Sequence, residues 1–315
     1  QGRRYGFFTF ADYFTDRQLL ALTPFSDLVG AAREKVLQDA SGPYADAVAT
    51  YLGVVVSKMT DRNSTLVNWY VSRESTSSTF SRQALPMMWD FAEVAPLGVN
   101  TGSFNNSLLW TCETVESLSG RLPGIVQQRD AATANPSGGL ISTDPPYYDN
   151  IGYSDLSDYF YVWLRRSLRE IYPELLGTML VPKAEELVAN PYRHGGREGA
   201  RQFFEEGFRQ VFAKARESAL PDFPITVYYA FKQTESSESG ETSTGWETLL
   251  DGMIQSGWSI TATWPVRSEL GNRMLASDTN ALASSIVLAL RPRPDDAPTT
   301  DRRGFIAALQ SELPD

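Results

Sequence analysis

The sequence predicts an α/β fold that is preceded by a mostly helical region. In the first 120 residues, apolar side chains recur at helical spacing. From Leu122 onward the chain instead shows short apolar runs separated by Gly, Pro and polar turns, with long helical patterns between some of the runs. That alternation is typical of a sheet whose strands are connected by helices. We therefore expect a helical region at 1–120, an α/β region at 121–292 and a tail at 293–315.

Helices are expected at three places in the first region. Thr15 and Gln18 have the spacing of a capping box, and the apolar residues that follow recur with helical periodicity, so a helix should begin near Thr15. Two further helices are expected at Tyr44–Met59 and from Phe104 toward Leu118.

The α/β region contains apolar runs that predict buried strands and longer patterns that predict helices. The strands are expected at Gly124–Gln127, Gly139–Thr143, Pro224–Phe231, Trp258–Trp264 and Ser284–Leu290. The helices are expected at Ser154–Ile171, Glu198–Ala219 and Trp246–Gln255, with a short one near Phe305–Leu313 in the tail. No helix-length periodic segment separates the last two strands, which predicts a terminal antiparallel hairpin. The polar segment Gln233–Thr244 is expected to be a mobile loop.

Composition limits the class of protein. With 315 residues, of which 42% are hydrophobic, the chain can build a sizeable core. It has no run of 18 apolar residues and no signal-peptide pattern, so we expect a cytoplasmic protein without a membrane partner. Cys112 and His194 are the only residues of their types, which excludes an internal disulfide and argues against a zinc ribbon, a multi-His metal site and a Ser-His-Asp triad. We expect no metal.

The charge balance argues against tight autonomous binding to nucleic acid. The formal net charge is −10, whereas nucleic-acid enzymes usually present a basic face. Basic residues nevertheless cluster in two stretches, which are Arg193, His194, Arg197, Arg201 and Arg209, and Arg165, Arg166 and Arg169. These stretches could contact phosphates, or they could be solvated helix faces balanced by nearby glutamates.

The most informative motif is Asp144-Pro145-Pro146-Tyr147, which directly follows an expected buried strand. Two consecutive prolines force a rigid, extended peptide whose carbonyls point outward. The Asp144 carboxylate accepts hydrogen bonds only, and Tyr147 offers an aromatic face for stacking. A planar exocyclic amine fits both groups. The alternative interpretation is an ordinary turn, since Asp and Pro are common turn residues.

This motif resembles the catalytic motif of S-adenosylmethionine-dependent amino-methyltransferases, which methylate adenine N6 or cytosine N4 in DNA. The longer string Thr143–Leu164 resembles the DUF1156-type adenine-specific DNA methylases, and so do the segments Phe80–Glu93 and Tyr192–Gly196. The resemblance covers nearly the whole chain. It implies a partial Rossmann-like methyltransferase sheet, whose last strand is inserted antiparallel to its neighbours and accounts for the terminal hairpin.

The resemblance also implies roles for individual residues. The amine of a flipped adenine would donate to Asp144 and to the Pro145 carbonyl, with Pro146 keeping the corner rigid and Tyr147 stacking on the base. Candidate cofactor-binding residues are Asp130 and Ala131, at the adenine edge of S-adenosylmethionine, and Thr9 and Phe10, near its methionine end. Candidate substrate-binding residues are Tyr148, Asn150, Tyr153, Arg193, His194 and Arg197. Asp130 could equally head a turn, Thr9 and Phe10 could belong to a buried aromatic run, and Tyr148 and Tyr153 could line a Tyr-rich core seam.

A Gly-rich cofactor loop after a first strand is missing from the sequence. Methyltransferases need the close backbone approach that only glycine permits, and none of the glycines in this chain matches that pattern. The chain also opens with Gln, inside an aromatic run, and we expect it to be the carboxyl-terminal portion of a longer methylase. An upstream segment or a partner subunit would then supply the loop. The alternatives are a non-catalytic or partner-completed nucleic-acid-binding module and an RNA amino-methyltransferase. The resemblance is compatible with a role in restriction-modification or phage defence.

Overall fold

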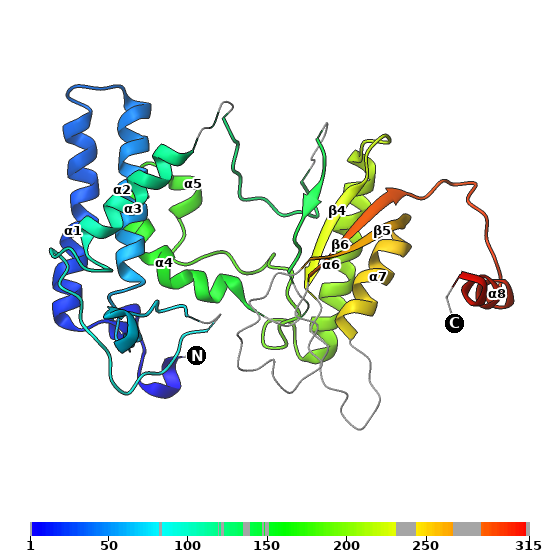
Figure 1. Ribbon diagram of the computed structural model, residues 1–315, viewed down its shortest axis with the longest axis horizontal. Helices are drawn as coiled ribbons and strands as arrows, with labels where there is room; N and C mark the ends of the chain where they lie inside the picture. Colours follow the sequence, from blue (N-terminus) through cyan, green and yellow to red (C-terminus); the bar gives the residue numbers. More distant parts are fainter. Residues whose placement is uncertain are drawn as a thin grey trace. The chain divides into compact units, whose positions relative to one another are not determined.

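The structure, a computed structural model, divides the chain into two compact units (Figure 1). It describes residues 2–81, 84–118, 120, 123–134, 139–146, 148, 151–230, 244–266 and 285–312. Unit 1 consists of residues 1–128 and 151–186, and unit 2 consists of residues 129–150 and 187–315. The chain thus passes from one unit to the other three times. Residues 151–186 group with the amino-terminal unit although their sequence position lies within the predicted 121–292 region.

Unit 1 is built on long helices at the positions that the sequence predicts. They are α1 (Asp16–Val36), α2 (Gly42–Thr60), α3 (Phe104–Ser117) and α4 (Tyr153–Leu168). The expected capping box starts α1, because the Gln18 backbone N–H donates to Thr15 Oγ1 at 3.2 Å and the Thr15 N–H donates to Gln18 Oε1 at 2.9 Å. Two backbone donors at the helix start are thereby satisfied, which confirms the predicted helix start.

Aromatic side chains from distant parts of the sequence form the centre of unit 1. The Phe14 ring lies 5.6 Å from the Tyr159 ring and 5.3 Å from the Trp163 ring, measured between centroids, so the segment before α1 packs on α4. The Phe80 ring contacts Tyr159 edge-on at 5.3 Å. Short elements complete the unit, and they are η1 (Gly2–Tyr5), η2 (Phe10–Tyr13), η3 (Val71–Arg73), β1 (Trp69–Tyr70), β2 (Ser75–Thr76) and α5 (Pro173–Leu176).

Unit 2 contains a mixed four-stranded sheet. Its strands are β3 (Ser142–Thr143), β4 (Ile225–Ala230), β5 (Trp258–Val266) and β6 (Ser285–Pro292), in the spatial order β3-β4-β6-β5. β3 pairs with β4 in parallel, whereas β6 is antiparallel to both β4 and β5. The predicted terminal hairpin is therefore confirmed, and its second strand is inserted between β4 and β5.

Helices cover one face of this sheet (Figure 1). They are α6 (Arg197–Ser218) and α7 (Thr244–Gln255), and α8 (Arg302–Glu312) follows the last strand. Phe204 and Phe208 of α6 and Leu249 of α7 pack with Val227 of β4 and Leu288 of β6 in one buried cluster. Because side chains alternate along a strand, Thr226 and Tyr228 of β4 face the opposite side of the sheet.

Two of the predicted strands are corrected by the structure. Residues Gly124–Gln127 form no strand, and the run Gly139–Thr143 is a strand only over its last two residues. Apolar sequence alone does not make a strand, because the backbone needs a neighbour to bond with, and Ile125 and Val126 are almost fully exposed in the structure. The expected helix Ser154–Ile171 ends earlier, at Leu168. All but the last residue of the predicted loop Gln233–Thr244 lies outside the described residues.

Candidate functional site

The Asp144 corner lies at the carboxyl end of β3. β3 and β4 run parallel, and β5 runs in the same direction because β6 is antiparallel to both β4 and β5. The carboxyl ends of these strands therefore share one edge of the sheet, which is where ligands bind in open α/β sheets. Asp144 is exposed at this edge, and Pro145 and Pro146 are half-buried behind it. Tyr147 and Asn150 lie outside the described residues.

Tyr148 fixes the far side of this corner to the core of unit 2. Its ring meets the Phe204 ring of α6 edge-on, with 5.0 Å between the centroids. Its backbone carbonyl accepts a hydrogen bond from the Ala189 N–H at 2.8 Å. The corner is thus held between the sheet and the first turns of α6. The role of Tyr148 as a substrate-binding residue stays a prediction.

The predicted basic loop meets the same end of α6. The His194 ring stacks on Phe203, with centroids 3.9 Å apart, and Phe203 precedes the residue that contacts Tyr148. Gly195 and Gly196 have φ values of 68° and 111°, a conformation that side chains disfavour, and this turn lets the loop enter α6. The structure therefore brings the Asp144 corner and the loop carrying Arg193 and His194 to one end of one helix. Sequence spacing alone did not reveal this proximity.

The charges along α6 are largely balanced within the helix. Arg201 contacts Glu198 at 2.8 Å and Glu205 at 3.3 Å, and Arg209 contacts Glu206 at 3.7 Å. The hydrogen bond from Arg201 lowers the pKa of Glu198. This part of the basic stretch fits the interpretation as a solvated helix face. Arg197, the first residue of α6, is exposed and lies beside the His194 loop.

Asp130 and Ala131 also belong to unit 2. Asp130 Oδ1 accepts from the Ala132 N–H at 3.0 Å, and its carbonyl accepts from the Ala134 N–H at 2.9 Å. The residue therefore heads a turn, as in the alternative interpretation of the sequence. Its second carboxylate oxygen has no hydrogen-bond partner among the described residues, and the predicted cofactor contact stays a prediction.

The remaining predicted site residues belong to unit 1. The Thr9 and Phe8 N–H groups donate to Asp12 Oδ2 at 2.7 and 2.8 Å, and these bonds lower the pKa of Asp12. Phe10 packs against the aromatic cluster around Tyr13, as expected for a buried aromatic run. Tyr153 is the first residue of α4, and its side chain is exposed.

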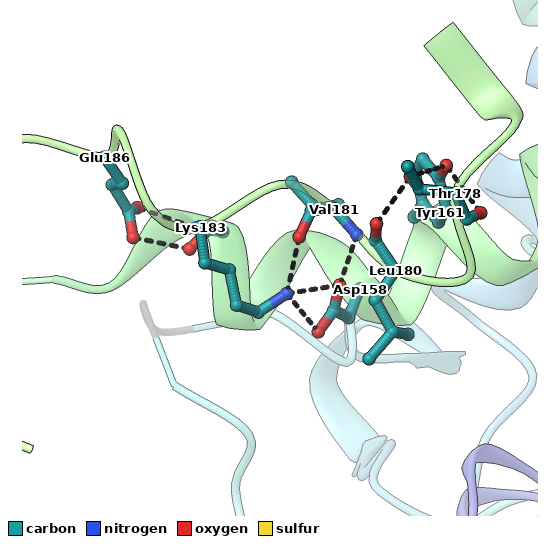
Figure 2. Close-up of polar contacts among 8 residues, drawn as sticks. Asp158, Tyr161, Thr178, Leu180, Val181, Lys183 and Glu186 are labelled. Atoms are coloured by element: carbon teal, nitrogen blue, oxygen red, sulfur yellow. Dashed lines mark hydrogen bonds and ion pairs between the residues drawn. The ribbon is translucent and has the colours of Figure 1, made fainter. Parts of the chain in front are cut away.

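A polar seam that was not predicted from the sequence holds the segment 178–186 along α4 (Figure 2). Lys183 Nζ lies 2.9 and 2.8 Å from the two carboxylate oxygens of Asp158 and also donates to the Val181 carbonyl at 2.8 Å. The Val181 N–H donates to Asp158 Oδ1 at 2.9 Å. Asp158 is buried, so these bonds replace the water that its carboxylate would otherwise bind.

The seam extends to both ends of the segment. Glu186 accepts from the Ser154 N–H at 2.8 Å and from the Ser154 hydroxyl, and thereby caps the first turn of α4. At the other end, the Tyr161 hydroxyl lies 2.8 Å from Thr178 Oγ1. Residues 154, 158 and 161 share one helix face. Their partners are Glu186, Lys183 and Thr178 in that order, so the segment 178–186 lies antiparallel to α4. The seam therefore fixes the helix start that carries Tyr153.

Other features of the described residues do not mark the predicted site. A shallow hollow of about 370 Å³ lies on α1 and is lined by Asp16, Leu19, Leu20, Thr23 and Pro24. No group of three His, Cys, Asp or Glu side chains within the described ranges could hold a metal ion. Among the described helices, none is long and apolar enough to cross a membrane.

Comparisons with protein-family models, with curated proteins and with solved structures find no match to this chain.

Proposed function

We propose that this chain is the catalytic portion of an S-adenosylmethionine-dependent DNA methyltransferase that modifies the N6 amine of a flipped adenine. The observation that carries the proposal is the position of Asp144-Pro145-Pro146, at the carboxyl end of β3 on the ligand-binding edge of the sheet. The antiparallel strand inserted between β4 and β5 agrees with the methyltransferase resemblance.

In the proposed reaction, the chain acts mainly by positioning and electrostatics. S-adenosylmethionine, when bound, supplies the methyl group. Asp144 and the Pro145 carbonyl accept the two hydrogens of the target amine, which directs the nitrogen lone pair toward the methyl carbon. With the cofactor bound, the N–C bond would form as the S–C bond breaks, and the nitrogen would then release its surplus proton to solvent water. Tyr147 stacks on the flipped base.

The cofactor-binding residues that we propose from this chain are Asp130, Ala131, Thr9 and Phe10. The free carboxylate oxygen of Asp130 can accept from an adenine amine, and the half-buried turn that it heads can hold an aromatic ring edge. The sequence holds no matching Gly-rich loop. β3 is an edge strand of the described sheet, and Ile125 and Val126 are exposed, which supports completion by an upstream segment or a partner subunit.

The proposed substrate is double-stranded DNA, with Tyr148, Asn150 and Tyr153 near the flipped base and Arg193, His194 and Arg197 near phosphates. The proximity of the His194 loop to the Asp144 corner supports this assignment. A cytoplasmic role in restriction-modification or phage defence belongs to the same proposal.

A partner-completed or non-catalytic nucleic-acid-binding module is the second candidate. Its partner-completed form is favoured by the net charge of −10 and by the ion pairs that occupy Arg201 and Arg209, because both weaken binding to phosphates by this chain alone. An RNA amino-methyltransferase would use the same corner, and only its substrate preference would distinguish it.

The test is methyl transfer from isotopically labelled S-adenosylmethionine to DNA and to RNA, with the product nucleosides identified by mass spectrometry. We expect N6-methyladenine in DNA when the chain is joined by the upstream segment or partner subunit that supplies the Gly-rich loop, and equally with Asp222→Ala, an exposed control before β4. Asp144→Ala should reduce the product by at least about a hundredfold, as expected for loss of a group that positions the reacting amine. Transfer that survives Asp144→Ala would overturn the proposal. A calorimetric titration with S-adenosylmethionine shows whether the chain binds the cofactor by itself.

A further inference from the structure

The helix α8 lies in solvent although it carries an apolar stripe. Every described side chain of α8 is exposed, and Phe305, Ile306 and Leu309 are exposed to 59%, 41% and 45%. Their spacing places them on one side of the helix. An isolated helix shorter than about 12 residues is only marginally stable in water, so most of its stability must come from packing its apolar side. The stability of α8 therefore requires an apolar surface that the helix can reach.

The sheet of unit 2 offers such a surface on the face opposite α6 and α7. Tyr228 of β4 and Trp264 of β5 lie on either side of Val287 of β6 on this second face, and the exposed fractions of Tyr228 and Trp264 are 41% and 52%. Val266, two residues after Trp264 on β5, lies on the same face and is also exposed. An exposed apolar patch of this kind commonly marks a surface that packs against another element.

The next row on the second face is shallow. It consists of Thr226, Ala289 and Ala262 on three adjacent strands, of which Ala289 is already buried and Thr226 and Ala262 are half-buried. Small side chains at this row let a helix approach closely, and the large side chains of Phe305 and Leu309 complement that shallow floor. The aromatic row beside it would then flank the helix.

The connection between β6 and α8 is short and anchored. The Arg293 N–H donates to the Gly257 carbonyl at 2.9 Å, and the Arg293 guanidinium donates to the Pro298 carbonyl at 3.1 Å. Arg216 of α6 donates to the Arg293 carbonyl at 3.0 Å. Only residues 299–301 then separate this anchored part from α8.

These lengths are compatible with docking on the same chain. Three extended residues span at most about 10 Å, and α8 is about 16 Å long. The Ala289 row lies four residues before Arg293 on β6, about 13 Å away along the strand. The second face is therefore within reach of α8.

We propose that α8 folds back onto the second face of the sheet of its own chain, with Phe305 and Leu309 against the half-buried Ala262 and the exposed Trp264. Such a short tether gives an effective concentration in the millimolar range, which favours this docking over exchange with a second copy. The connecting segment 293–301 leaves the sheet where Pro292 pairs with Trp258, the first residue of β5. This is the edge opposite the one that carries Asp144. The docking of α8 is thus independent of the proposed methyltransferase activity.

The test is chemical crosslinking with a short bis-maleimide. Cys112 is the single cysteine and is exposed, so Cys112→Ser provides a thiol-free background. The docked pair is Ala262→Cys with Leu309→Cys, and the control pair is Gln210→Cys with Leu309→Cys, where Gln210 lies exposed on α6. We expect the docked pair to crosslink within one chain at least about tenfold faster than the control pair. Equal rates would overturn the proposal.

Two further substitutions test which side of α8 contacts the sheet. Adding Phe305→Asp should lower the crosslinking rate of the docked pair to that of the control pair, whereas Ala307→Asp, on the other side of the helix, should not. Mixing two chains that each carry one of the docked-pair cysteines tests exchange, and predominant crosslinking between chains would overturn docking within one chain.

Hydrogen exchange of the unmodified chain avoids any effect of the cysteines on folding. Docking predicts slowed exchange of the α8 amides, and that protection should be lost in Phe305→Asp. Exchange of these amides at the rate of an unfolded peptide in the unmodified chain would contradict the proposal.

Discussion

The two units differ in how their interiors are specified. All buried polar or charged residues among the described ones belong to unit 1, and they are Gln18, Ser26, Thr60, Asn63, Ser64, Thr76, Ser77, Thr79, Ser103, Ser107, Ser154 and Asp158. The buried residues of unit 2 in the described ranges are apolar or aromatic, and most of them form one cluster between the sheet, α6 and α7. Unit 1 therefore depends on specific polar partners, whereas unit 2 depends on the burial of apolar volume.

This difference has consequences for tolerance to substitution. In unit 1, the Asn63 side-chain amide donates to the carbonyls of Met59 and Gly102 at 2.8 and 2.9 Å. A hydrogen bond of 2.7 Å joins the hydroxyls of Ser64 and Thr79. Removing one partner of such a pair leaves a buried polar group unsatisfied. An apolar core accepts swaps that conserve volume, and it is sensitive to cavities instead. We therefore expect unit 1 to be most sensitive to the loss of a buried polar partner and unit 2 to be most sensitive to the loss of apolar volume.

The largest effect is expected for Phe204→Ala in unit 2. Phe204 is fully buried in the cluster and also contacts Tyr148, so its truncation leaves a cavity that should cost about 3–5 kcal/mol. Hydrogen exchange should show the loss of protection in residues of unit 2 and little change in unit 1. Phe204→Leu, which retains much of the volume, is the control and should cost clearly less. Equal loss of protection in both units would contradict the independence of the two interiors.

Lys183→Met is expected to be the most damaging substitution of a charged residue in unit 1. It leaves the buried Asp158 carboxylate with the Val181 N–H as its remaining donor among the described residues, and should cost about 3 kcal/mol. The matched control is Lys214→Met, which removes an exposed ion pair with Glu217 on α6. Combining Lys183→Met with Asp158→Asn should recover much of the loss, because a neutral amide still accepts from Val181. No recovery in the double variant would show that Lys183 stabilises unit 1 by packing alone.

The Tyr159 phenol should make unit 1 sensitive to alkaline pH. Its hydroxyl donates to the Thr60 carbonyl at 2.8 Å, and burial raises its pKa well above the ordinary value of 10.0. Above pH 10 the unfolded chain releases this proton while the folded chain keeps it, so stability falls as pH rises through this range. Tyr159→Phe should cost about 1–2 kcal/mol at neutral pH, because the Thr60 carbonyl loses its shorter hydrogen bond and keeps only that from the Asn63 N–H at 3.4 Å among the described residues.

The pH dependence separates these two contributions. Denaturant unfolding monitored between pH 9 and 11 should give a flatter decline for Tyr159→Phe, by up to about 1.4 kcal/mol per pH unit. Tyr44→Phe, at an exposed position of α2, should behave like the unmodified chain. The account of Tyr159 fails if Tyr159→Phe and the unmodified chain lose stability in parallel.

The smallest effect is expected for the exposed pair between Arg166 and Asp27. Two hydrogen bonds of 2.8 and 2.9 Å join the guanidinium to the carboxylate, but both side chains are about half exposed. Arg166→Ala should therefore cost no more than about 1 kcal/mol, and the cost should shrink in high salt. Denaturant unfolding at low and high salt tests this. A cost like that of Lys183→Met would remove the distinction between buried and exposed polar contacts.

Local signals allowed much of the fold to be predicted from sequence. The capping box at Thr15 marked the start of α1, and the lack of a helical pattern between Trp264 and Ser284 indicated the β5–β6 hairpin. The strand predicted at Gly124–Gln127 is wrong because apolar sequence does not show whether a neighbouring strand exists. Contacts between distant residues, such as those of Asp158 with Lys183, leave no periodic signal in the sequence.

The candidate site shows the same limit. The motif itself identified Asp144, and strand direction explains its position at the sheet edge. The stacking of His194 on Phe203, beside the contact of Tyr148 with Phe204, depends on how the loop before α6 turns at Gly195 and Gly196. Residue types and spacing do not determine that turn.

The most direct test of the central claim is whether Asp144 recognises the hydrogens of an adenine amine. The measurement compares binding of two oligonucleotides that differ only at an unpaired target base, which is adenine in one and N6,N6-dimethyladenine in the other. We predict that the chain binds the adenine oligonucleotide about tenfold more tightly, since the dimethyl base has no amine hydrogen to donate to the Asp144 carboxylate. Asp144→Ala should abolish this preference and Asp222→Ala should retain it. Equal affinity of the unmodified chain for both oligonucleotides, or the same preference in Asp144→Ala, would contradict the account.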